Sequence, residues 1–212
     1  MTEAQASAWR VNCSRILSIC SFGSAITLVY AGMVLVSDPR TNLRSPRLED
    51  AAPLFAAIDA SRAYLRRWLP WVDGSTSPEH TREFLRSAIA GAAEGKSLVL
   101  VIEHEGQPCG TAGFNWIDVA NGTCEIGYWL REDLQGRGIM TGCCRALVVQ
   151  AFDGLGLYSV RIAAAVENER SRRIPERLGF HLDGVIRAAE RLSSGHVDQA
   201  VYTFLRREYE TR

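Results

Sequence analysis

The chain has 212 residues, of which 47% are hydrophobic and 23% are charged. These proportions are ordinary for a globular protein, and the length suits one domain with a sizeable core. The formal net charge is zero, so no broad basic surface for nucleic acid is implied and we expect no nucleic-acid partner.

The cysteines and histidines give no sign of a metal site. No two of the six cysteines form a Cys-x-x-Cys pair, and the four histidines lack the spacing of ligands, so we expect no metal. Four cysteines lie in apolar-periodic segments, as small core residues of a cytosolic protein do: Cys109, Cys124, Cys143 and Cys144. We therefore expect a cytoplasmic protein.

Residues 16–37 carry no charged side chain, and this uncharged segment is long enough to cross a bilayer. Serine, threonine and glycine dilute the apolar character, and no small-residue cleavage site follows. Three interpretations stay open: an extension ahead of a true start at Met33, a membrane or interface anchor over residues 16–36, and a segment packed on the domain. We expect an N-terminal extension over residues 1–37 and a folded domain over residues 38–212.

The first predicted elements of the domain are a strand over residues 43–48 and a helix over residues 49–60. A helical segment over residues 61–71 follows, with Trp68 and Trp71 placed around Pro70; the two rings could simply cap the core. Ser77 and Pro78 predict an N-cap and a first helical position for an amphipathic helix that ends at Gly95. Three strands then follow, over residues 97–104, 109–118 and 123–130, joined by turn sequences.

The most informative stretch joins the last of these strands to a helix. Residues 124–130 alternate as a half-buried strand, and a helix pattern then begins at Ile139. Gly136 and Gly138 lie between them, where backbone N–H groups at a helix N-terminus can hold an anionic group without interference from side chains. The pattern predicts a phosphate cradle.

The remaining residues complete an alternating pattern of strands and helices. Val160, Ile162, Ala164 and Val166 predict a fifth strand, and a helix over residues 168–178 closes at Gly179. Strands over residues 180–191 and 197–206 form a last hairpin. Strands that alternate with single helices and end in a hairpin indicate an α/β fold around a mixed sheet.

The glycine segment resembles a known signature. Gln135-Gly136-Arg137-Gly138-Ile139 is similar to the acetyl-CoA motif of the GCN5-related N-acetyltransferases (GNAT), although Met140 departs from it at the last position. Glu-Ile-Gly-Tyr-Trp-Leu at 125–130 and the blocks at 166–171 and 175–180 resemble the ribosomal-protein N-terminal acetyltransferase branch. The resemblance covers residues 43–209. It implies the GNAT fold, an α/β fold with a mostly antiparallel sheet of about seven strands, flanking helices, and a splay between the fourth and fifth strands.

The resemblance also implies a coenzyme site without a metal. Backbone groups of the fourth strand, residues 125–130, would hold the pantetheine arm and the thioester carbonyl, and Asn168 would contact the arm. The residues expected to bind acetyl-CoA are Tyr128, Trp129, Leu130, Gln135, Gly136, Arg137, Gly138, Ile139, Met140, Thr141 and Asn168. The cluster of Arg170, Arg172, Arg173 and Arg177 is either a solvated helix face or a partner of the coenzyme 3′-phosphate.

Two residues match the catalytic positions of the resembled branch. Glu190 matches its general base, with Glu125 as the competing base; the plain alternative is that Glu190 is an exposed hairpin glutamate. Ser171 matches the hydroxyl that faces the coenzyme sulfur, and the alternative is a helix cap, although Asn168 already stands at the capping position. Trp68 and Trp71 would form a wall of the acceptor groove.

The sequence therefore predicts an acetyl-CoA-dependent N-acetyltransferase, with the N-terminal amine of a ribosomal protein as acceptor and a serine start favoured. The same apparatus could acetylate a small amine such as an antibiotic or a polyamine, and a non-catalytic acyl-CoA-binding module is the alternative of another class. We expect a monomer or homodimer that contacts a membrane only through residues 16–36.

Overall fold

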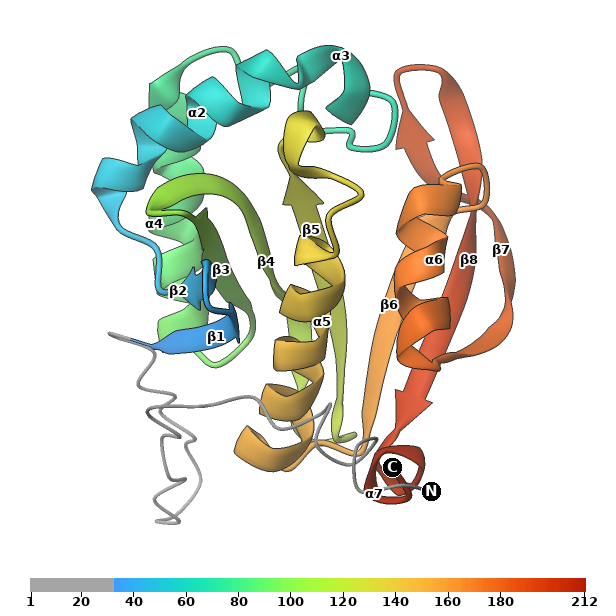
Figure 1. Ribbon diagram of the computed structural model, residues 1–212. Coiled ribbons are helices and arrows are strands. Elements are labelled where there is room, and N and C mark those ends of the chain that lie inside the picture. Colours follow the sequence, from blue (N-terminus) through green and yellow to red (C-terminus); the bar gives the residue numbers. More distant parts are fainter. Residues whose placement is uncertain (1–32) are drawn as a thin grey trace.

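The computed structural model describes residues 33–212, which form an eight-stranded sheet with the strand order β1-β2-β3-β4-β5-β6-β8-β7 (Figure 1). The strands are β1 (Val34–Asp38), β2 (Thr41–Arg44), β3 (Leu98–His104), β4 (Gln107–Asp118), β5 (Thr123–Leu130), β6 (Ser159–Ala165), β7 (His181–Leu192) and β8 (Gly195–Leu205). Neighbouring strands are antiparallel except β5 and β6, which run parallel. This is the mostly antiparallel α/β sheet expected from the sequence, with one strand more.

Helices cover both faces of the sheet. They are α2 (Ala51–Ala60), α3 (Arg62–Leu65), α4 (Pro78–Ala93), α5 (Ile139–Val149), α6 (Glu169–Leu178) and α7 (Arg206–Glu210), with the short 3-10 helices η1 (Leu48–Asp50) and η2 (Glu132–Leu134) and the π-helix η3 (Gln150–Gly154). Leu100 and Ile102 of β3 pack in the same cluster as the α5 side chains, whereas Val101 between them packs with α2 and Leu85 of α4. Because successive strand residues point to opposite faces, α5 lies on one face and α2 with α4 on the other.

The additional strand is β1, which overlaps the end of the uncharged segment 16–37. Val34 faces Arg44 and Val36 faces Asn42 across the β1–β2 pair, and Met33 and Leu35 are buried in the core. The sheet therefore starts before residue 38, where we expected the domain to begin. The greater part of the possible anchor, residues 16–32, lies outside the described residues, and no helix within residues 33–212 is long and apolar enough to cross a membrane.

Two other predicted boundaries and one predicted helix cap differ from the structure. The strand expected at 43–48 ends at Arg44, shortly before Pro46, which has no N–H for a ladder bond. The Arg44 guanidinium donates to Asp50 at 2.7 and 2.8 Å. The helical segment expected at 61–71 is helical only over α3 and continues as turns around Pro70. The Ser77 side chain makes no capping bond, although Pro78 begins α4 as expected. Helix α7, a single turn, was not predicted.

The buried cysteines behave as expected from the sequence. Cys109, Cys124, Cys143 and Cys144 are all free and buried. Burial raises the pKa of Cys109 to about 11 and the pKa of Cys124 to about 12, so these thiols stay protonated at neutral pH. They serve as small apolar core residues.

Candidate active site

One cleft, of about 1990 Å³, opens where β5 and β6 diverge. In Figure 1 the two strands lie close together at the bottom and separate toward the top, beneath α3. The residues predicted from the sequence to bind or react all line this cleft: Trp68, Trp71, Glu125, Tyr128, Trp129, Leu130, Gln135, Gly136, Arg137, Gly138, Ile139, Met140, Thr141, Asn168, Ser171 and Glu190. The fold thus brings together residues from the turns after α3 to the last hairpin.

The divergence of β5 and β6 has a defined start. The parallel ladder pairs Thr123 with Ser159 and ends at the pair Ile126 and Ile162. Beyond it, the rest of β5 stays paired with β4 on its other side, as far as Leu130 with Gly110. The edge of β5 that faces β6 is therefore open to the cleft beyond Ile126, and its backbone N–H and C=O groups can bond a ligand.

The glycine loop has the open backbone geometry that an anion site requires. Gly136 and Gly138 have φ angles of 76° and 82°, a left-handed conformation that other residues rarely adopt. A Cβ atom built on either residue would meet nothing within 4 Å, so the loop backbone is open on the side where Cβ would lie. Helix α5 starts at Ile139, and the first N–H groups of a helix have no intrahelical acceptor and attract negative charge. The arrangement suits a diphosphate.

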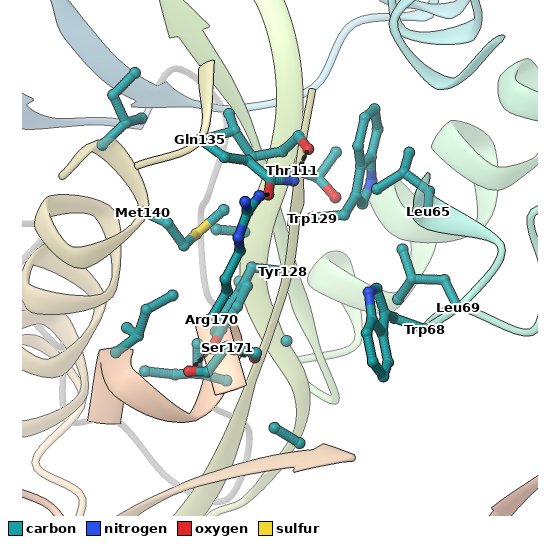
Figure 2. A pocket seen from close by; sticks show the side chains of 18 of the residues that line it. Leu65, Trp68, Leu69, Thr111, Tyr128, Trp129, Gln135, Met140, Arg170 and Ser171 are labelled. Carbon is teal, nitrogen blue, oxygen red and sulfur yellow. Dashed lines mark hydrogen bonds between the residues drawn. The ribbon is translucent and has the colours of Figure 1, made fainter. Parts of the chain in front are cut away.

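Arg170 adds a cation close to this loop. Its guanidinium donates to Gln135 Oε1 at 3.3 Å, and Gln135 Nε2 in turn donates to the Leu130 carbonyl at 3.2 Å. Figure 2 shows the Arg170 side chain extending from α6 toward Gln135, and its guanidinium lies 5.9 Å from the centre of the Tyr64 ring. Arg170 therefore connects α6 to the loop that precedes α5.

The arginine cluster on α6 divides into two groups. Arg172 donates to Tyr202 Oη and to the Val166 carbonyl, each at 3.0 Å, and so serves the packing of α6 on the sheet. Arg170, Arg173 and Arg177 line the cleft instead. Only these three remain as partners for a coenzyme phosphate within the cluster.

The two candidate bases have different environments. Glu125 forms an ion pair with Arg161 at 3.0 Å and accepts a hydrogen bond from Asn115 Nδ2 at 3.1 Å. Glu190 Oε2 accepts a hydrogen bond from Gln199 Nε2 at 3.0 Å. Burial raises the pKa of Glu190, and the negative charge of Glu125 raises it further against the opposing effect of Gln199. Glu190 is the carboxylate whose surroundings favour taking up a proton.

Ser171 lies near the start of α6 with its hydroxyl on Tyr128. Tyr128 Oη is 2.9 Å from Ser171 Oγ and donates to the Ser171 carbonyl at 3.3 Å. Asn168 Oδ1 accepts the Ser171 backbone N–H at 3.2 Å, which makes Asn168 the cap of the helix. The Ser171 hydroxyl is therefore not used as the cap, as the sequence suggested.

The opposite wall of the cleft is aromatic. Trp129 is buried among α2, α3 and Leu85, and Trp71 meets it edge to face at 6.0 Å between ring centroids. Trp68 is half-buried, and its indole Nε1 has no acceptor among the described residues. Figure 2 shows Trp68 and Trp129 on one side of the pocket and Ser171 with Tyr128 on the other.

Sequence reasoning missed one residue and one contact that support the site. Gln199 donates a hydrogen bond to Glu190. Because strand residues alternate between faces, Gln199 shares a face of β8 with Val197 and Val201, and a polar residue between two valines was the sequence signal for a site residue. The bond between Tyr128 and Ser171 had no sequence signal, because the two residues are 43 positions apart. Within residues 33–212 no three His, Cys, Asp or Glu side chains form a group that could hold a metal ion.

An open, mostly antiparallel sheet that splays at its one parallel pair, with a glycine loop leading into a helix at the splay, defines an acyl-coenzyme A transferase fold. Residues 40–181 match the model of the acetyltransferase (GNAT) domain. The chain belongs to the GNAT family and is an acetyltransferase.

Curated relatives and solved structures agree with this assignment. The Bacillus subtilis protein YdaF, provisionally named a ribosomal N-acetyltransferase, is 34% identical over 163 residues, which are 76% of this chain and 89% of the relative. The ribosomal-protein-serine acetyltransferase of Escherichia coli is 31% identical over 150 residues, 71% of this chain and 84% of the relative. The self-immunity acetyltransferase MccE, solved with acetyl-CoA and AMP, superposes with a TM-score of 0.77 at 27% identity and covers 85% of this chain and 99% of its own.

Proposed function

We propose that the protein transfers the acetyl group of acetyl-CoA to the N-terminal amine of a ribosomal protein, with a serine start favoured. The observation that carries the proposal is the placement of Glu190, with its raised pKa, and of Ser171 on the same cleft where β5 opens. The similarity to the E. coli ribosomal-protein-serine acetyltransferase supports the choice of acceptor.

In the proposed complex the coenzyme diphosphate binds the backbone of residues 136–141 at the start of α5, and the pantetheine arm follows the open edge of β5 beside Asn168. Arg170 lies where it can pair with a phosphate after leaving Gln135. No metal is required, because backbone N–H groups supply the positive potential.

The proposed reaction is a direct transfer. Glu190 removes a proton from the acceptor ammonium, and the neutral amine attacks the thioester carbonyl. Backbone N–H groups of β5 stabilise the oxyanion, which then collapses with cleavage of the carbon–sulfur bond. Ser171 gives its hydroxyl proton to the leaving thiolate and regains a proton, through solvent, as the amine nitrogen loses its second proton. Glu190 then releases the first proton to solvent, so that acetylated amine, free coenzyme A and the original enzyme result.

Glu190 is proposed as the base in preference to Glu125 because of their partners. The carboxylate of Glu125 is already engaged by both Arg161 and Asn115. The raised pKa of Glu190 brings it closer to the working pH, which is the condition that general-base catalysis favours.

A second acceptor class is a small-molecule amine that carries a flat ring. Trp68 and Trp71 present an aromatic wall that could stack on such a ring, and MccE, which this chain resembles in fold, was solved with AMP. The two classes differ in what surrounds the amine, so a panel of acceptors separates them.

The test is acetylation of that panel, followed by mass spectrometry of ribosomal proteins from a host with and without the enzyme. A peptide with an N-terminal serine should be acetylated on its α-amine, and the same peptide with a blocked N-terminus should not. Preferential acetylation of an aminoacyl nucleotide or a polyamine, with ribosomal proteins unchanged, would replace the proposed acceptor by a small amine.

The roles of Glu190 and Ser171 are tested by substitution. A general base contributes about 10²–10⁴-fold, so Glu190→Gln should lower kcat by that factor near pH 7 while coenzyme affinity stays unchanged. Higher pH should partly restore the rate, because an N-terminal amine with a pKa of about 7.7–8.0 then arrives neutral. Ser171→Ala should lose rate without that recovery. The control is Glu83→Gln, an exposed glutamate of α4 outside the cleft. Full activity of Glu190→Gln together with loss in Glu125→Gln would place the base on β5.

A further inference from the structure

The strand that carries Glu190 contains an irregularity just before this residue. In the β7–β8 hairpin Ile186 faces Gln199 and Glu190 faces Val197. Four steps along β7 therefore match only two steps along β8, and residues 187–189 bulge out of the ladder opposite Asp198. Such bulges bend a strand and redirect the side chains that follow.

A side chain of the neighbouring strand holds this bulge. Ala188 has a φ of 50°, a left-handed conformation that a residue with a Cβ atom rarely adopts without outside support. The support is Asp198, whose Oδ1 accepts the Ala188 backbone N–H at 2.8 Å. The Asp198 carbonyl accepts the Val166 N–H at 2.9 Å, which ties the bulge to the end of β6 at the cleft.

The bulge decides where Glu190 lies. If the ladder continued without a bulge from Ile186, Val197 of β8 would face Ala188 rather than Glu190. Glu190 would then lie opposite a residue two positions nearer the hairpin tip, about 7 Å farther along β8. The bulge brings Glu190 back opposite Val197. It is then diagonal to Gln199, which faces Ala165 of β6 and donates the 3.0 Å hydrogen bond to the Glu190 carboxylate.

We propose that Asp198 is a positioning residue of the acetyltransferase, which acts through the β7 bulge to hold Glu190 at the cleft. The inference rests on the proposed role of Glu190 as base. Asp198 itself is exposed and is not among the residues that line the cleft, so it acts on the reaction through the backbone of residues 187–189.

The test compares the initial rates of Asp198→Ala, Asp198→Asn and Glu190→Gln, singly and combined, with the coenzyme affinity of each. Asp198→Ala should lower kcat by roughly ten- to a hundredfold, the range expected for a small misplacement of a catalytic group, and should leave the coenzyme Kd unchanged. Asp198→Asn keeps a carbonyl acceptor for the Ala188 N–H and should retain most of the rate. Asp183→Ala, at an exposed aspartate of β7 outside the cleft, is the control and should match the unaltered protein.

A double variant separates positioning from general destabilisation. Asp198→Ala should cause no further loss in a Glu190→Gln protein, because both changes remove the same carboxylate from the reaction. An equal loss in both backgrounds, or a normal kcat in Asp198→Ala while Glu190→Gln is impaired, would overturn the positioning role and leave the proposed base standing. Normal activity of Glu190→Gln would instead overturn the base and this inference together.

Ala188→Gly supplies a second route if Asp198→Ala folds poorly. Glycine adopts a positive φ without a supporting hydrogen bond, so Ala188→Gly should recover part of the kcat in the Asp198→Ala protein. If Ala188→Gly restores the melting temperature of the Asp198→Ala protein but does not raise its kcat, the proposal is also contradicted.

Discussion

Tyr128 Oη lies 2.9 Å from Ser171 Oγ, and this contact joins β5 to α6 across the face of the sheet that α5 also covers. Burial raises the pKa of the Tyr128 phenol, so Tyr128 stays neutral and acts as a hydrogen-bond partner of the hydroxyl. Tyr128 was expected to contact the coenzyme; it lines the cleft, and its hydroxyl contacts the proposed acid. The orientation of Ser171 therefore depends on Tyr128.

The first prediction tests this contact. Tyr128→Phe keeps the ring and removes one hydrogen bond of about 0.5–1.5 kcal/mol, so kcat should fall roughly three- to tenfold with the coenzyme Kd unchanged. In a Ser171→Ala protein the same change should have little effect on kcat. Equal losses in both proteins, measured by steady-state kinetics, would mean that Tyr128 acts independently of Ser171.

The second prediction concerns the glycine loop. Gly138→Ala and Gly156→Ala both place a Cβ atom on a residue of positive φ in open space, at 82° and 67°, and should each lower the free energy of unfolding by about 1–2 kcal/mol. Only Gly138 lies on the cleft, so only Gly138→Ala should raise the Kd of acetyl-CoA, by about tenfold or more. Calorimetric titration measures this. Equal coenzyme affinity in the two variants would rule out the loop as the diphosphate site.

The third prediction follows from the raised pKa of Glu190. A base must be ionised, so kcat/KM should rise with pH through the pKa of Glu190, above the range of an ordinary glutamate. The charge of Glu125 contributes to that increase. Glu125→Gln should therefore keep substantial activity and move the acidic limb of the pH profile to lower pH. If the acidic limb of the kcat/KM profile does not move in Glu125→Gln, Glu190 is not the group whose ionisation produces that limb.

The fourth prediction concerns the start of the chain. Met33 and Leu35 are buried, and the Met33 carbonyl accepts the Ser45 N–H at 3.0 Å. A chain that begins at Met33 should fold and bind acetyl-CoA. A chain that begins at Thr41 lacks the buried side chains of Met33 and Leu35, and its free energy of unfolding should therefore be lower by about 3–6 kcal/mol. Denaturant unfolding compares them. Loss of coenzyme binding in the chain that begins at Met33 would show that residues 1–32 belong to the working domain.

The alternation of residues 124–130, the two glycines and the helix that begins at Ile139 are local features, and they were sufficient to predict β5, the glycine loop and α5. The final hairpin and α6 were likewise predicted within a few residues. The cleft could be assembled from these elements because their order along the chain matched the resembled family.

The contacts of the site depended on partners that are distant in the sequence. The α6 arginines look alike in the sequence, yet Arg172 packs on Tyr202 while Arg170 reaches Gln135, because the direction of each side chain is set by how α6 lies on the sheet. The position of Glu190 depended on a bulge that Asp198 holds, and the side-chain pattern of β7 does not show where a bulge shifts its pairing with β8. Periodicity and glycine spacing thus determined which elements form, because these depend on neighbours within one or two turns. Tertiary packing alone decided which side chains meet, because those meetings require strands and helices far apart in the chain to be fixed relative to one another.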